Sequence, residues 1–538
     1  ADGISYGSGY AKHPIGGILR DVSLRALPKV YPREICIVTN LAENYKHADL
    51  VVSGTISSRP FRGRIGISIT DPYNTKIPLQ QKEIIIEDTG TFTIRNVMRS
   101  PHKWDAEHPR LYTLTLTYFE DGQPVYRNDH KVGFRKVEIN GNRMLVNGKE
   151  IKLRGANRHD IHPLLGRVST PEYERRDVRL AKEANMNFIR TSHYPPTENF
   201  LTLCDEYGIY VEDESAVCFV GSHRTAAYYP GASESDTAFT GRYLSQLREM
   251  VVNHRNHPSV ILRSIGNENS FGSNFKLSYD WVKATDTTRP VIFSYPGHVP
   301  DSVKAYEVLS MHYPGIDGNM NQIGKITRGF GHPDLPAIFD EWAHVACYNN
   351  FTIKEDPNIR DFWGRSLDSM WTRVYEADGG LGGAIWGMID ETFMLPDTLP
   401  GFNNWWGIVD PHVIPAEYSG HTVGYGEWGI VDTWRRKKPE FWNTKKAYSP
   451  FKIVKTRFSP EEANGPLNVP VYNRFDHTNL SELKIKYRYR GKNHLADKTN
   501  LGPHQKGTLV LHSGKWLPGE PIYLEARDGN GRIIDQYT

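Results

Sequence analysis

The sequence has few cysteines, no long apolar run and almost no net charge. Its four cysteines lie far apart without CxxC spacing, which indicates neither a disulfide framework nor a zinc ribbon. No apolar stretch approaches the roughly 20 residues needed to cross a bilayer. With 65 basic and 62 acidic residues the formal charge is only +3, so composition favours neither nucleic acid nor a membrane surface as a partner. A partner must be sought in a specific site.

The two ends of the chain show the alternation of apolar and polar residues that is typical of β-sheets. In residues 29–137, segments such as Leu50–Ile56, Arg64–Thr70 and Leu111–Phe119 are separated by Gly, Pro and Asp. This pattern predicts an antiparallel, immunoglobulin-like β-sandwich. Residues 451–538 return to the same alternation and predict a second sandwich. The chain stops there after only a few strand candidates, so we expect that sandwich to be incomplete.

The middle of the chain, residues 138–450, alternates apolar strand candidates with helical patterns. Eight β-rich segments occur, most of them separated by helix-length stretches. Thr170-Pro171-Glu172 combines an N-cap residue with proline at the first helical position, which predicts the start of a helix. The pattern predicts a (β/α)8 TIM barrel. The fold class is therefore multidomain, an α/β barrel flanked by all-β sandwiches.

Two of the eight segments end in carboxylates. The fourth ends in Gly266-Asn267-Glu268, and the seventh ends in Asp340-Glu341. Reacting groups of such barrels sit at the carboxyl ends of strands, and strands four and seven lie on opposite sides of the mouth. Glycoside hydrolysis with retention uses two carboxyls about 5–5.5 Å apart, one protonated to assist the leaving group and one ionised to attack the anomeric carbon. We predict Glu268 as the general acid/base and Glu341 as the nucleophile.

The residues around these carboxylates favour catalysis over the more common alternative. A single glutamate at a strand end is usually an ordinary charge, and a single histidine or tryptophan is usually a core residue. Asn267, however, places an amide next to the acid, where it is suited to bind a sugar hydroxyl. The aromatic content of 12% also suits sugar binding, but large β-rich proteins share it.

With these motifs in place, the sequence resembles glycoside hydrolase family 2, and within it the bacterial β-galactosidases. Arg255 to Glu268, RNHPSVILRSIGNE, is similar to the acid/base signature of the family, and AIFDEWAH is similar to its nucleophile segment. Asp340 and Trp342 depart from the usual residues there. Residues 1–28 resemble the end of the sugar-binding jelly roll that precedes the sandwich in this family.

The resemblance carries further roles to single positions. Arg190, in RTSHYP, would lie near the nucleophile and keep it ionised by its charge. Tyr313 would hydrogen-bond the nucleophile, and Trp386 would form the floor of the sugar site. The full set of substrate-binding residues implied in this way is His159, Arg190, His193, Asn267, Tyr313, His344, Trp386 and Trp428.

The sequence departs from the β-galactosidases at both of their metal sites. Cys218 and Val220 stand where the resemblance implies magnesium ligands after strand three, and neither suits a hard cation, although Glu268, the third ligand, is present. Trp428 stands where a sodium ligand is implied near the sugar 6-hydroxyl. Gly426-Glu427-Trp428 also lacks the Asn-x-Lys of the family's glucuronidases. We therefore expect no metal site and no cofactor, and do not expect a glucuronide substrate.

These observations predict a retaining exo-hydrolase that releases a terminal β-galactosyl residue from an oligosaccharide or glycoside. Several alternatives stay open. The same mechanism could act on an α-L-arabinopyranoside, a β-galacturonide, a β-mannoside or a modified polysaccharide fragment. A catalytically silent glycan-binding scaffold is disfavoured by the presence of both carboxylates. Whether the mouth is a pocket or an endo-acting cleft is not visible in the sequence.

The compartment and the assembly stay open as well. The chain begins ADGISYGSGYAKH, without Met and without a charged segment followed by an apolar one. We expect it to be an internal part of a longer polypeptide. Periplasmic, secreted and cytoplasmic locations are all compatible with it, and so is a homo-oligomer.

Overall fold

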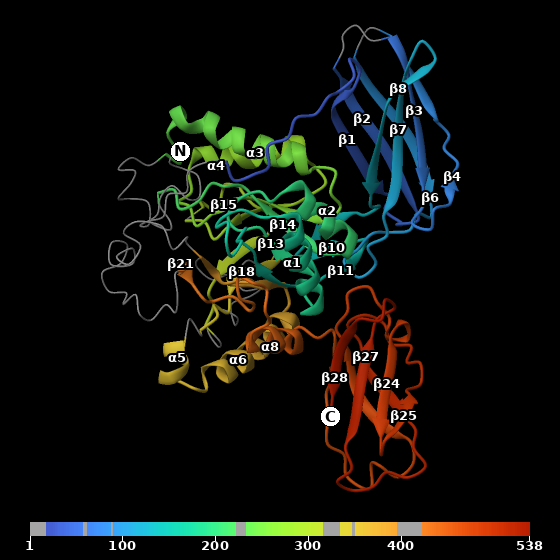
Figure 1. Ribbon diagram of the computed structural model, residues 1–538, viewed down its shortest axis with the longest axis vertical. Coiled ribbons are helices and arrows are strands. Elements are labelled where there is room, and N and C mark those ends of the chain that lie inside the picture. The colour runs from blue at the N-terminus through green and yellow to red at the C-terminus, as the bar shows by residue number, and fades with distance from the viewer. Residues whose placement is uncertain are drawn as a thin grey trace.

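The computed structural model describes residues 18–538 except 58–61, 88–89, 222–232, 298, 316–333, 347–349 and 395–421. A barrel forms the centre, and two sandwiches lie on the same side of it (Figure 1). Of the expected jelly-roll end, residues 1–17 lie outside the described ranges, and residues 18–31 form neither helix nor strand. Cys36, Cys204 and Cys218 are free thiols, and Cys347 lies outside the described ranges.

The first sandwich is built from two antiparallel sheets with alternating burial. In β6 (Thr91–Arg99) every second residue is buried, because successive side chains of a strand point to opposite faces. The buried face packs into one core with residues such as Leu50, Ile94 and Leu114. One sheet has the order β1 (Pro32–Leu41), β2 (His47–Ile56), β6; the other contains β3 (Arg62–Thr70), β4 (Lys76–Ile77), β5 (Glu83–Glu87), β7 (Tyr112–Glu120) and β8 (Gln123–Val132).

The barrel contains the eight predicted parallel strands in the predicted order. They run in the spatial order β16-β15-β14-β13-β12-β19-β18-β17, and the bridge Ile292–Val308 brings the two ends of this row together. Its strands are almost wholly buried, as expected where both faces of a parallel sheet are covered. They are β12 (Leu153–Asn157), β13 (Phe188–Arg190), β14 (Tyr210–Glu214), β15 (Val260–Asn267), β16 (Val291–Ser294), β17 (Leu309–His312), β18 (Ala337–Trp342) and β19 (Gly380–Ile385).

The first helix of the barrel begins where the sequence predicts. Thr170 caps the first helix by accepting a hydrogen bond from the Tyr173 N–H, and Pro171 is its first residue. Between β16 and β17 the described residues form no helix, because Pro296, Gly297 and Pro300 interrupt the short connection. The helices are α1 (Pro171–Glu183), α2 (Glu198–Tyr207), η1 (Thr237–Phe239), α3 (Thr240–His254), α4 (Ser273–Thr285), α5 (Asn350–Glu355), α6 (Ile359–Glu376) and α8 (Pro439–Ala447).

Small sheets occur at both ends of the barrel strands. A three-stranded sheet precedes β12, and a two-stranded sheet follows β19. Asn147 and Gly148 both have positive φ in the hairpin of the first sheet, as their dipeptide predicts. These strands are β9 (Val137–Asn140), β10 (Arg143–Val146), β11 (Lys149–Glu150), β20 (Glu391–Met394) and β21 (Thr422–Gly426).

The second sandwich has more strands than we expected from its sequence. We predicted only a few, but residues 451–538 contain seven in two sheets, because short, charge-rich segments such as Lys492–Leu495 also pair. One sheet has the order β22 (Phe451–Ile453), β23 (Leu467–Asn473), β26 (Lys506–Leu511); the other has β25 (Lys492–Leu495), β24 (Lys484–Tyr489), β27 (Ile522–Arg527), β28 (Ile533–Tyr537), and η5 (Leu480–Glu482) connects them.

Both sandwiches contact the amino-terminal side of the barrel strands. The buried Arg135 guanidinium, at the end of the first sandwich, donates to the carbonyls of Pro258 and Val260, where β15 begins. Asn185, just before β13, donates to the carbonyl of Ile534 in the second sandwich. The carboxyl ends of the strands, where a barrel carries its site, therefore point away from these contacts.

Closure of the barrel depends on a glycine in β19. Gly382 has φ +144°, and a Cβ placed there would lie 1.8 Å from the Leu153 carbonyl oxygen of β12. We expect Gly382→Ala to lower the free energy of unfolding by about 3 kcal/mol or more, since backbone strain and overpacking add. Urea unfolding measures this, with Gly514→Ala as the control, because a Cβ at Gly514 meets nothing within 4 Å. Equal stability of the two variants would contradict the expectation.

Candidate active site

The two predicted catalytic carboxylates meet at the mouth of the barrel. Glu268 directly follows β15, and Glu341 lies in β18. A carboxylate oxygen of each lies within 4.8 Å of the other and of a ring nitrogen of His312. Both side chains therefore face one small volume.

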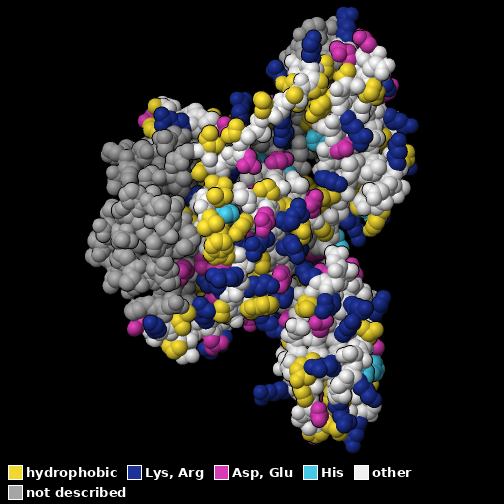
Figure 2. Space-filling view, viewed as in Figure 1, with side chains coloured by type: hydrophobic (Ala, Val, Ile, Leu, Met, Phe, Trp, Pro, Cys, Tyr) yellow, Lys and Arg dark blue, Asp and Glu magenta, His cyan; other side chains and the backbone are white. Residues whose placement is uncertain are grey.

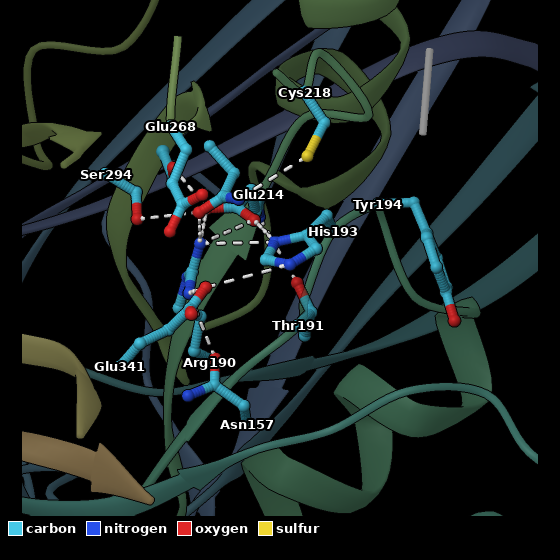
Figure 3. A network of polar contacts seen from close by, with 12 residues as sticks. Asn157, Arg190, Thr191, His193, Tyr194, Glu214, Cys218, Glu268, Ser294 and Glu341 are labelled. Carbon is cyan, nitrogen blue, oxygen red and sulfur yellow. Dashed lines mark hydrogen bonds and ion pairs between the residues drawn. The ribbon is translucent and has the colours of Figure 1, made fainter. Parts of the chain in front are cut away.

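Arg190 binds Glu341 from below. Its fully buried guanidinium donates from Nη1 to Glu341 Oε1 at 2.9 Å, and from Nη2 to Glu214 Oε2 at 2.8 Å and to Asn267 Oδ1 at 2.7 Å (Figure 3). Burial alone would lower the pKa of Arg190, but Glu214, Asp340 and Glu341 together raise it well above its ordinary value. Arg190 is therefore a permanent cation in direct contact with Glu341.

Glu214, the last residue of β14, is a site residue that the sequence did not reveal. It binds Arg190, accepts a hydrogen bond from Ser264 Oγ, and lies 2.7 Å from His193 Nδ1. Burial would raise the pKa of Glu214, but Arg190 and His193 lower it, so the carboxyl group is ionised. With Nδ1 bound to Glu214, His193 directs Nε2 toward Glu341 Oε1 at 3.7 Å. Glu214 thus fixes the orientation of a predicted substrate contact.

His312, the last residue of β17, is a second residue that we missed, although it directly precedes the predicted Tyr313. Its Nδ1 lies 2.9 Å from Glu268 Oε1 and 3.7 Å from Glu341 Oε2, and its Nε2 lies 3.4 Å from Asp340 Oδ1. Burial would lower the pKa of His312, but the surrounding carboxylates raise it to about 10. A protonated imidazole therefore lies between the two predicted catalytic groups.

Asp340 anchors this imidazole. It accepts hydrogen bonds from Ser294 Oγ at 2.7 Å and Ser310 Oγ at 2.6 Å. Burial would raise the pKa of Asp340, but His312 and Arg190, together with the Ser310 hydrogen bond, lower it to about 2. Asp340, which the sequence marked only as a departure from its relatives, is thus an ionised partner of His312.

A cavity of about 260 Å³ opens above Glu341. Tyr313 is 43% exposed and donates from its hydroxyl to Glu341 Oε2 at 2.6 Å. His193 stacks on Trp386, with ring centroids 5.3 Å apart. The residues that line the cavity are His193, Phe219, Asn267, Tyr313, Glu341, His344, Trp386 and Trp428.

Seven of the ten predicted site residues line this cavity, and the other three lie beside it. Glu268 follows the lining residue Asn267, and Arg190 is buried beneath Glu341. His159 is buried with its ring 5.4 Å from that of Trp386. Phe219, which has a positive φ, lines the cavity too, but no motif marked it. The structure brings all the predicted residues to one place, while their roles stay predictions.

Three described residues of the site could offer ligand atoms to a metal ion. Oxygen or nitrogen atoms of Glu268, His312 and Glu341 lie within 4.8 Å of one another. Cys218 is a buried thiol that accepts a hydrogen bond from Asn267 Nδ2, and burial raises its pKa well above the ordinary value. Cys218 and Val220 do not fit the oxygen-rich coordination that magnesium requires.

The face of the molecule shown in Figure 2 carries charges of both signs. Figure 2 shows acidic and basic side chains interspersed over the visible face of the barrel and of both sandwiches. In the described part of the chain, no helix is both long and apolar enough to cross a bilayer. The concave, aromatic-lined cavity is thus the feature from which function must be argued.

The fold and this cavity define a glycoside hydrolase architecture, and sequence comparison agrees. Residues 31–135 match glycosyl hydrolases family 2, and residues 137–359 match the TIM barrel domain of glycosyl hydrolases family 2. The chain belongs to glycoside hydrolase family 2.

Within the family, the chain is similar to bacterial β-galactosidases. It is 31% identical to that of Vibrio vulnificus over 395 residues, and 34% identical to that of Photobacterium profundum over 396 residues. Each alignment covers 70% of this chain but only 36% of the relative, so the chain spans about a third of the length of these relatives.

Solved structures of the family share the fold. The β-glucuronidase of Parabacteroides merdae superimposes with a TM-score of 0.61 at 19% identity, over 95% of this chain and 63% of that one. The β-galacturonidase of Eisenbergiella tayi gives a TM-score of 0.58 at 22% identity, over 78% of this chain and 73% of that one. At such identities the likeness concerns the fold alone.

The charge on His312 predicts a pH dependence of stability. In the folded protein its pKa of about 10 exceeds the ordinary value of 6.5. The stabilisation that the charged imidazole gives to the folded state is therefore complete below pH 6.5 and is lost as the pH rises through 10. Between pH 7 and 9 we expect the free energy of unfolding to fall more steeply in the wild type than in His312→Gln, by up to about 1.4 kcal/mol per pH unit. Urea unfolding at several pH values measures both slopes.

The difference between the two proteins reports His312 together with the carboxyl groups whose pKa values it lowers, such as Asp340. His47→Gln, which changes an exposed histidine of β2, is the matched control and should keep the wild-type slope. Identical slopes for wild type and His312→Gln would show that His312 is not a buried cation.

Proposed function

We propose that this protein is a retaining exo-glycosidase that releases a terminal β-galactosyl residue by double displacement. The observation that carries the proposal is the pair Glu268 and Glu341, whose nearest oxygens lie within 4.8 Å. This is close to the about 5–5.5 Å typical of retaining enzymes and well short of the about 6.5–9.5 Å that an inverting enzyme leaves for its water. The similarity to β-galactosidases supports the choice of sugar.

The contacts of Glu341 suit its proposed role as the nucleophile. In the first step, Glu341 attacks the anomeric carbon while the proton of Glu268 passes to the departing oxygen, so that the glycosidic bond breaks and a glycosyl ester forms on Glu341. Arg190 and Tyr313 both donate hydrogen bonds to the Glu341 carboxylate, which hold it in a fixed orientation. In the second step, Glu268 removes a proton from water, and the resulting attack on the anomeric carbon releases Glu341.

The size of the cavity supports attack at a chain end. A volume of about 260 Å³ suits a single sugar ring better than a long glycan segment. Trp386 borders the cavity, but it is only 2% exposed and its ring stacks on His193. His193, Asn267 and His344 supply polar groups around the cavity.

Substitution of the two carboxyl groups tests the proposal. We expect Glu341→Gln and Glu268→Gln each to lower kcat for an aryl β-galactoside by at least about a thousandfold, because each removes a group that reacts directly. With an activated aryl leaving group, the rate of the first step should fall less in Glu268→Gln. Added azide should restore turnover of this variant and give a β-glycosyl azide as the product. Unchanged sugar release in either variant would contradict the assignment.

A panel of aryl glycosides identifies the sugar in the same assay. β-Galactoside, α-L-arabinopyranoside, β-galacturonide, β-mannoside and β-glucuronide are compared by kcat/KM. Proton NMR of the first-formed product reports whether the anomeric configuration is retained. Activity on a non-galactosyl member alone would replace the proposed sugar and leave the mechanism in place.

We also propose that turnover needs no magnesium. The support is that a thiol and a valine occupy the expected ligand positions, while His312 places a positive charge 2.9 Å from Glu268. We expect dialysis against EDTA to leave kcat within about twofold, since removing a catalytic metal typically costs far more. A loss that added magnesium restores would disprove this.

A further inference from the structure

Glu391 is a buried carboxyl group that contacts two residues of the site and has no role so far. It opens β20 and is 3% exposed. Trp428, which lines the cavity, donates from Nε1 to Glu391 Oε1 at 3.1 Å. His159 Nε2 lies 3.6 Å from the same oxygen. Glu391 therefore adjoins the site through an aromatic and an imidazole side chain.

The surroundings of Glu391 leave its charge poorly compensated. Its Oε2 accepts no hydrogen bond from any residue in the described ranges, although that atom is buried. Burial raises the pKa of Glu391 to about 7; the Trp428 hydrogen bond and Arg167 oppose this, while Glu341 and Asp390 add to it. Burial and Arg167 lower the pKa of His159 well below its ordinary value, so the facing imidazole is neutral.

The position of Glu391 relative to the reacting groups indicates which part of a sugar it senses. The anomeric carbon must lie between Glu268 and Glu341. The ring of Trp428 packs against His344, 5.1 Å between centroids, on the part of the cavity wall that Glu391 supports. With its anomeric carbon at the carboxylate pair, a pyranose directs C4 and the C5 substituent toward the remaining walls, of which Trp428 is one.

We propose that Glu391 determines specificity by making the site accept a glycone with a hydroxyl group on its C5 substituent and reject one with a carboxylate there. Glu391 is buried behind the cavity wall and does not line it, so its charge acts on the glycone through space. A hydroxyl carries no charge for it to repel, whereas a uronate brings a second negative charge into a poorly solvated place. The inference rests on the proposed function and assigns its substrate class, a neutral glycone. It supplies a physical cause for discrimination against uronides.

Glu391 could instead serve only to hold Trp428, and a conservative substitution separates the two roles. Gln retains an acceptor for Trp428 Nε1 but cannot ionise. A purely structural role affects neutral and uronide substrates equally, whereas a charge-based role affects the uronide alone.

The experiment compares kcat/KM for two matched pairs, aryl β-galactoside with aryl β-galacturonide and aryl β-glucoside with aryl β-glucuronide. In Glu391→Gln we expect kcat/KM for the uronide to rise at least about tenfold, since one like-charge repulsion is removed, while the neutral substrate changes by less than about threefold. Glu427→Gln, a neighbouring carboxyl group that faces Lys438, is the matched control and should keep the wild-type ratio.

The ratio of neutral to uronide kcat/KM should also depend on pH. It should rise in the wild type as the pH passes through about 7 and rise less in Glu391→Gln, because Glu391 gains its charge in this range whereas Asp390, whose pKa is also raised to about 7, titrates in both proteins. The groups that face Glu391 are His159, Trp428, Arg167, Asp390 and Glu341. The ionisation of the catalytic pair acts on both substrates and cancels in the ratio.

An unchanged ratio in Glu391→Gln, or an equal loss for both members of a pair, would overturn the inference. If the enzyme hydrolyses the glucose pair but not the galactose pair, galactose is not its sugar. The ratio measured with the glucose pair still tests the role of Glu391. If no glycoside of either pair is hydrolysed, the shift in thermal unfolding caused by D-galactose, D-glucose and their uronates gives the answer. The wild type should be stabilised by the neutral sugars and not by the uronates, whereas Glu391→Gln should be stabilised by both. If uronates shift the thermal unfolding of the two proteins equally, the inference is disproved.

Discussion

The buried guanidinium of Arg190 is the interaction on which the arrangement of the site depends. Glu212, Glu214, Asp340 and Glu341 all project into the barrel, and so many carboxylates cannot ionise together in a poorly solvated interior without a cation among them. Arg190 contacts Glu214 directly and, with His193, lowers its pKa. Glu212, 3.5 Å from Arg190 and in a buried setting, instead has a pKa raised well above its ordinary value. This cation thereby contributes to which carboxyl groups of the barrel carry charge.

His312 acts as a second cation on the other side of Glu341. Together with Arg190 it divides the site into two ion networks, one through Glu214 and His193, the other through Asp340 and Glu268. Glu341 is within 4 Å of both cations, and Glu268 lies next to His312. The two carboxyl groups proposed to react therefore experience different fields although they lie close together, which is what opposite roles as acid and nucleophile require.

The sequence predicted the barrel, its strand order and the two carboxylates because these depend on local patterns. Glu268 and Glu341 stand at strand ends that apolar segments mark clearly. Glu214, His312, Asp340 and Glu391 could not be assigned in this way, since their significance comes from side chains of other strands that meet them inside the barrel. His312 directly precedes a recognised residue, but nothing local shows that three carboxylates surround it. The last sandwich was underestimated because its short polar strands lack apolar alternation.

The contacts of Arg135 and Asn185 with the sandwiches have a further consequence for how such a molecule can change over time. They attach the accessory domains at the amino-terminal side of the barrel, while Glu391, Trp428 and the other residues around the sugar lie at the opposite side. A substitution that alters which sugar is accepted therefore leaves the joints between domains untouched, and a change in those joints leaves the sugar site untouched. Selection can act on the two ends of one barrel separately, so substrate preference can diverge while the assembly of domains stays the same.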